Sequence, residues 1–299
     1  MSETGPETGP GTLSAREVGT HTVANTTLLD ERLVMAYATS INDQNEAYFD
    51  DTRPGGLNVH PGIVFSLQWN SRFRPGQPVN MRAAPYGVHA HTDLSIVRPF
   101  SCGEAITTQG RLIARQQIPP GVYSVERYTM RDAKGDVIAV LDYNGITRGA
   151  TLEGDNVRID DDVPEPAFEP TSEGEPDWID HIHVPRHAGQ QYTECARIYN
   201  PIHTERSVAL AAGLPDIILH GSATKAMALS SVIQHCFEGD ARRITRLSGQ
   251  LRAMVLMNTD IRVVCHQVSD DETERKIRFS VLNQDSKPAI ANGFVVGRL

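Results

Sequence analysis

The stretch Asn200-Pro201-Ile202-His203, followed further along the chain by His220-Gly221, is the most informative part of this sequence. An apolar, glycine-marked segment, 209–218, lies between the two, and an alanine-rich segment that we predict to be helical follows Gly221. The pattern therefore predicts an imidazole beside the N-terminus of a helix. A histidine transfers protons, and free backbone N–H groups hold an oxyanion. Chemistry next to an acyl carbonyl needs both groups, so an acyl substrate is predicted.

The longer segment 192–203, Tyr-Thr-Glu-Cys-Ala-Arg-Ile-Tyr-Asn-Pro-Ile-His, resembles the hydratase motif of the MaoC-like (R)-specific enoyl-CoA hydratases and dehydratases. The match holds at Tyr192, Asn200, Pro201, Ile202, His203, His220 and Gly221. At the position of the family's catalytic aspartate this chain has Ile198, and the preceding glycine is Arg197. An isoleucine can neither accept a proton nor orient water, so the family's acid/base pair is incomplete here.

A weaker copy of the pattern lies in the first half of the chain. Segment 37–48 repeats the residue spacing of 192–203, which predicts a tandem duplication. The first copy keeps the aspartate, as Asp43, but has Tyr48 where the second copy has His203. Each half therefore holds one member of the acid/base pair.

The resemblance implies the hot dog fold, in which a curved antiparallel sheet wraps around a central helix. Two copies imply a double hot dog of the α+β class, and the predicted order of elements agrees. Hydrophobic periodicity and end signals predict helices that begin after Asp30 and that cover 63–70, 205–212 and 222–236. Strands are predicted at 105–117, 122–131, 137–146, 244–257, 261–268, 276–283 and 289–297.

The predicted domains follow the repeat and the composition. Residues 1–14, which are polar and rich in Pro and Gly, are expected to form a flexible tail. Residues 15–150 form a degenerate hot dog domain, 151–183 an acidic linker, and 184–299 a MaoC-like hot dog domain.

Composition excludes several classes of partner. A net charge of −9 argues against nucleic acid, because phosphate binding needs a clustered positive surface. No apolar run approaches the roughly 18 residues of a membrane helix. The four cysteines are scattered, and no dinucleotide, phosphate-loop or metal motif is present. We therefore expect a cytoplasmic homodimer without cofactor or metal.

Candidate site residues follow from the motif and its resemblance. The predicted catalytic residues are His203, Asn200, Gly221 and Asp43, and the predicted substrate-binding residues are Tyr192, Tyr199, His220 and Ser222. Two of these have structural alternatives, because asparagine before proline is common in turns and Asp43 could cap a helix end. Glu194 and Glu205 are candidates to replace the missing carboxylate.

The resemblance implies reversible hydration of a 2-enoyl thioester to a 3-hydroxyacyl thioester, a hydro-lyase reaction, carried on coenzyme A or on an acyl carrier protein. Loss of the aspartate could alter this chemistry. The alternative function is non-catalytic: an acyl-thioester binding protein, or a scaffold subunit whose partner supplies the complete acid/base pair.

Overall fold

A continuous antiparallel sheet forms the framework of the protein. The computed structural model describes residues 10–72, 86–161, 164–166 and 175–299. Five strands come from the first half of the chain: β2 (Asn25–Leu28), β3 (Gly87–Ile96), β4 (Ala105–Ile118), β5 (Gly121–Arg131) and β6 (Val137–Arg148). Five come from the second half: β9 (Trp178–Val184), β10 (Ile244–Leu251), β11 (Thr259–Asp270), β12 (Glu274–Leu282) and β13 (Pro288–Arg298).

The order of strands repeats between the two halves. Across the sheet the order is β2-β4-β5-β6-β3 and then β10-β13-β12-β11-β9. Each half thus places its strands in the same sequence, from its first strand at the outer edge to its second strand at the centre. The antiparallel pair of β3 and β10, with Thr92 opposite Gly249, joins the halves edge to edge. This arrangement is the one that a tandem duplication predicts.

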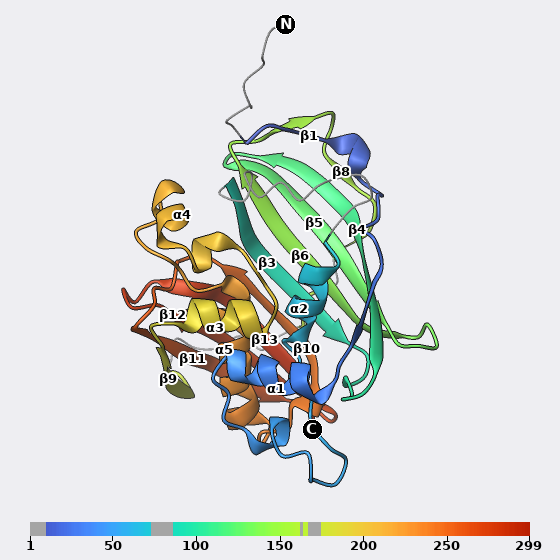
Figure 1. Ribbon diagram of the computed structural model, residues 1–299, viewed down its shortest axis with the longest axis vertical. Helices are drawn as coiled ribbons and strands as arrows, with labels where there is room; N and C mark the ends of the chain where they lie inside the picture. Colours follow the sequence, from blue (N-terminus) through green and yellow to red (C-terminus); the bar gives the residue numbers. More distant parts are fainter. Residues whose placement is uncertain (1–9, 73–85, 162–163, 167–174) are drawn as a thin grey trace, which may run out of the picture.

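The helices are α1 (Glu31–Ser40), α2 (Ile63–Asn70), α3 (Ala188–Cys195), α4 (Arg206–Ala211) and α5 (Gly221–Cys236). Figure 1 shows α1, α2, α3 and α5 gathered on one side of the sheet, near the junction of its two halves. The longest of them, α5, is buried along most of its length and corresponds to the predicted central helix. Its small residues, such as Ala223, Ala226 and Ala228, allow the helix to lie close to its neighbours.

Most predicted elements are confirmed. Asp30 caps α1, because its carboxylate accepts a hydrogen bond from Leu33 N at 2.8 Å. The predicted strands 122–131 and 137–146 correspond to β5 and β6, which pair with each other in the sheet. The elements that were not predicted include β2, β3, β9 and α3, and the strand expected at 244–257 ends at Leu251.

Strands lie within the segments that were expected to form a tail and a linker. The expected linker, 151–183, contains β7 (Thr151–Glu153), β8 (Val157–Arg158) and most of β9. The strands that the second half contributes to the large sheet therefore begin at Trp178. The last residues of the expected tail, Thr12–Ser14, form β1, which pairs in parallel with β7. Residues 1–9 of that tail lie outside the described residues. Among the described helices, none is long and apolar enough to span a membrane.

Candidate active site

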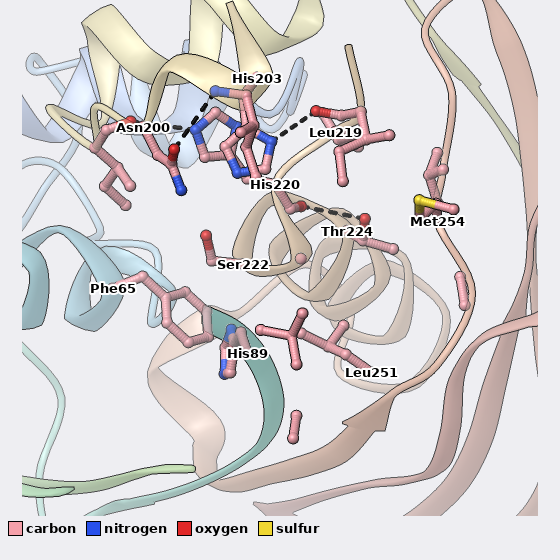
Figure 2. Close-up of a pocket in the computed structure, with 18 of the residues that line it drawn as sticks. Phe65, His89, Asn200, His203, Leu219, His220, Ser222, Thr224, Leu251 and Met254 are labelled. Atoms are coloured by element: carbon pink, nitrogen blue, oxygen red, sulfur yellow. Dashed lines mark hydrogen bonds between the residues drawn. The ribbon is translucent and has the colours of Figure 1, made fainter. Parts of the chain in front are cut away.

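A cavity of about 340 Å³ opens at the N-terminus of α5, and both halves of the chain line it. The second half contributes Asn200, His203, His220 and Ser222, whereas the first contributes residues from α2, β3 and β6, among them Phe65, His89 and Tyr143. Figure 2 shows the histidines of the second half and His89 at opposite sides of this space. Its volume is that of an ordinary small-ligand site.

His203 is held in one orientation by a backbone carbonyl. It lies at the end of a single 3-10 turn, η4 (Pro201–His203), and its Nδ1 is 2.7 Å from Ile218 O. A carbonyl oxygen only accepts hydrogen bonds, so Nδ1 carries the hydrogen and Nε2 keeps its lone pair. Burial lowers the pKa of His203 to about 4, although the bond to Ile218 opposes this change. The ring is therefore neutral near pH 7 and can act as a base.

His220 packs directly on His203, with the ring centroids 3.7 Å apart. Its Nε2 is 3.2 Å from Ile198 O and 3.4 Å from Thr193 Oγ1. Burial, together with the neighbouring His203, lowers the pKa of His220 well below its usual value. Ile198 thus contacts His220 through its backbone oxygen, while its own side chain is buried.

The N-terminus of α5 provides free N–H groups at the cavity. His220 is the N-cap residue, and its side chain makes no capping hydrogen bond to the helix. The first N–H groups of an α-helix have no acceptor within the helix, and its dipole makes this end positive. A methyl group at Gly221 would lie 2.4 Å from Leu251 Cδ1, so glycine lets the Leu251 side chain pack against this turn.

Asn200 lies at the cavity and also shapes its wall. The side-chain oxygen accepts a hydrogen bond from Ile202 N at 3.4 Å, and the backbone oxygen accepts one from His203 N at 3.0 Å. Both contacts stabilise the turn that carries His203. These contacts support the alternative interpretation of Asn200, in which it stabilises a turn.

Of the other predicted residues, only some line the cavity. Tyr192 is fully buried behind Ser222, with which its hydroxyl forms a hydrogen bond, and Ser222 itself lines the cavity. Tyr199 is 48% exposed, and its hydroxyl donates to Glu205 at 3.0 Å. Neither Tyr199 nor Glu205 lines the cavity. Glu194 does not line it either.

Asp43 is not brought to His203. It lies in another recess, beside the later turns of α5, where Asp180 and Met227 are neighbours. Its carboxylate accepts a hydrogen bond from Asn45 N at 2.9 Å, which is a local turn contact. Asp43, a predicted catalytic residue, thus lies apart from His203, and within the described residues no carboxylate lines the cavity.

The corresponding position in the first half is filled by side chains. His60, the counterpart of His220, is 1% exposed and accepts a hydrogen bond from Gly62 N at 3.0 Å. Its other ring nitrogen is 3.1 Å from Ser230 Oγ on α5. Tyr48, the counterpart of His203, is completely buried, and Tyr37 stacks on His60. This half supports the fold and supplies one wall of the cavity.

The sequence did not predict which residues of the first half line the cavity. His89 and Tyr143 lie on β3 and β6 and stack with centroids 4.1 Å apart, while Phe65 and Trp69 come from α2. No motif connects these residues, because only the pairing of distant strands brings them together. The helix at 63–70 was predicted. No sequence pattern indicated that residues of this helix line the cavity.

Comparisons with known proteins agree with this architecture. Residues 171–287 match the family described as MaoC like domain. The fatty acid synthase beta subunit pigK of Monascus ruber is 34% identical over 96 residues, which are 30% of this chain and only 5% of that protein.

Several solved structures share the fold. A MaoC-like dehydratase from Phytophthora capsici superposes with a TM-score of 0.77 at 18% identity, covering 92% of this chain and 95% of that one. The peroxisomal multifunctional enzyme type 2 from Drosophila melanogaster gives 0.73 at 15% identity, covering 93% of this chain and 48% of that one. A Mycobacterium tuberculosis protein described as having a double hotdogfold gives 0.62 at 13% identity, covering 94% and 96%. The chain thus has the double hot dog fold, and a segment of its second half, 171–287, matches the MaoC-like domain family.

Proposed function

We propose that the chain catalyses the reversible addition of water to a 2-enoyl thioester, which gives a 3-hydroxyacyl thioester. One observation carries this proposal: His203, neutral and with an unshared electron pair on Nε2, lines the same cavity as the uncapped N-terminus of α5. The first group can move a proton, and the second can hold the negative charge that develops on a thioester oxygen.

The reaction needs no other reactant. His203 Nε2 accepts a proton from water while the water oxygen bonds to C3 of the substrate. The electrons of the C2–C3 double bond move to the thioester oxygen, and the N–H groups at Gly221 and Ser222 stabilise the resulting enolate. The imidazolium then returns the proton to C2 as the enolate collapses. Dehydration is the reverse. A single imidazole suffices for both transfers, which fits a described cavity wall without a carboxylate.

The substrate would be carried on coenzyme A or on an acyl carrier protein, in fatty acid or related acyl metabolism. The fatty acid synthase relative is consistent with acyl chemistry of this kind, although the match covers little of that protein. The cytoplasmic homodimer expected from the sequence stays a prediction.

The test is the hydration of crotonyl-CoA and longer 2-enoyl-CoA esters, followed by loss of the enoyl absorbance. We expect His203→Ala to lower kcat/KM by roughly 10² or more, the usual contribution of a general base. His183→Ala is the matched control, because His183 is an exposed histidine on β9 that pairs with Asp260. Equal loss in both variants, or none in His203→Ala, would contradict the proposal.

A second candidate function is the binding of an acyl thioester without turnover. It is favoured by the absence of a carboxylate among the described cavity residues and by the distant place of Asp43. Tight binding of acyl-CoA by the wild-type chain, with no hydration of any enoyl ester and no dehydration of the 3-hydroxyacyl ester, would support this function instead.

A further inference from the structure

Lys225, on α5, carries a buried amine. The residue is 1% exposed, and among the described residues its Nζ has no hydrogen-bond partner. Burial lowers the pKa of Lys225 well below its usual value, although the charge of Asp93 opposes this change. A buried polar group without a partner is costly and usually has a functional explanation.

Lys225 belongs to the side of α5 that faces the cavity. Successive helical residues are rotated by about 100°, so Lys225 lies between the directions of Gly221 and Ser222, one turn deeper. Both of those residues line the cavity. Long side chains on a helix point back toward its N-terminus, which directs the Lys225 amine toward the cavity end of α5.

Lys225 itself does not line the cavity, but it acts electrostatically on a residue that does. Burial lowers the pKa of His89, and the electrostatic effect of Lys225 lowers it further. His89 lines the cavity, stacks on Tyr143, and has its Nε2 2.5 Å from Thr92 Oγ1. The inner end of the cavity is therefore polar, and the proposed proton transfers at His203 use neither His89 nor Lys225.

We propose that this end of the cavity binds an oxygen acceptor on the acyl group, and that Lys225 donates a hydrogen bond to it. The inference rests on the proposed function and narrows its substrate class to acyl thioesters with a carbonyl or carboxylate oxygen beyond the reacting carbons. The flexible lysine stem allows Nζ to turn toward such a group. An apolar acyl chain would leave the amine unpaired, as in the free protein.

Calorimetric binding of three saturated thioesters of equal chain length tests this inference. Pentanoyl-CoA has no distal oxygen, 4-oxopentanoyl-CoA has a carbonyl, and glutaryl-CoA has a carboxylate. We expect the wild-type chain to bind at least one oxygenated ester about tenfold more tightly than pentanoyl-CoA, which corresponds to one added hydrogen bond of about 1.4 kcal/mol.

Lys225→Met should remove this preference and leave the affinity for pentanoyl-CoA unchanged. Lys225→Gln, which restores a donor, should recover part of the preference for the carbonyl ester. Lys287→Met is the control, because its side chain is 70% exposed. Methionine should also be tolerated in the fold, since it removes a buried amine and keeps the length of the side chain.

Equal affinities for the three esters in the wild-type chain would overturn the inference, as would a preference that survives in Lys225→Met. No binding of any ester would overturn it as well. Because these probes are saturated, the measurement does not depend on turnover. The chain could fail to hydrate enoyl esters and still show a preference for oxygenated esters that depends on Lys225. In that case the proposed reaction would be wrong, and the inference about Lys225 would stand.

Discussion

The protonation state of His203 determines the pH range in which the site can act. A base must be neutral, and burial lowers the pKa of this ring to about 4. The neutral fraction is therefore nearly constant from mildly acidic to alkaline pH and decreases only as the pH falls toward this pKa. Its tautomer is set by a single contact, the bond from Nδ1 to Ile218 O.

We accordingly expect kcat/KM for hydration to stay level from about pH 8 to about pH 5.5, with no decline near the usual histidine pKa of about 6.5. Activity should then fall as the pH approaches 4. A pH–rate profile, with intrinsic fluorescence recorded at each point to exclude unfolding, provides the measurement. An inflection near pH 6.5 would show that the ring titrates as an exposed histidine does.

The start of α5 is a position at which a small substitution would disturb the packing of the cavity wall. Gly221 opens the helix, and a methyl group there would meet Leu251 Cδ1 at 2.4 Å. Leu251 also lines the cavity, so its displaced side chain would enter the space available to the substrate. The glycine is needed here for close packing and not for a positive φ, since Gly221 is absent from the positive-φ residues.

We predict that Gly221→Ala lowers kcat/KM about tenfold or more, because loss of one oxyanion contact costs roughly 10² to 10³ and a partial displacement costs less. The double variant Gly221→Ala/Leu251→Ala should regain much of the activity, since the clashing side chain is shortened. Steady-state kinetics of the two single variants and the double variant decide this. Failure of Leu251→Ala to rescue would mean that the methyl group blocks the substrate directly.

The predictability of elements varied with the strength of their local pattern. The alanine-rich run after Gly221 predicted α5 to within one residue of its start. β3 was missed because a register shift between His89 and His91 interrupts its alternation, and several of its residues are polar. α3 was missed because it is short and has no side-chain cap at its N-terminus.

The two halves of the chain form one structural unit. Buried apolar residues from both halves form one hydrophobic cluster, and the sheet is continuous through β3 and β10. Asp93 on β3 and Arg246 on β10 form an ion pair at 2.8 Å, with side chains 14% and 13% exposed. The hydroxyl groups of Tyr37 and Tyr192, the corresponding tyrosines of the two copies, are 3.5 Å apart.

We therefore expect a single cooperative unfolding transition in scanning calorimetry, because separation of the halves would expose the shared core. The fragments 1–150 and 151–299, produced separately, should lack a cooperative transition, and co-expression should restore it. Two resolved transitions in the intact chain, or cooperative unfolding of either fragment alone, would contradict this prediction.

The amino-acid sequence alone predicted the duplication, from a repeated spacing, and the double hot dog fold, which the resemblance of a short motif implies. It also indicated His203 and Gly221 as candidate site residues, because their chemistry can be recognised within short segments. Only the tertiary structure decided that Asp43 lies away from His203, and that His89 and Tyr143 form the opposite wall. The same holds for the buried, unpartnered amine of Lys225. Each of these depends on packing between residues far apart in the chain, which local patterns do not encode.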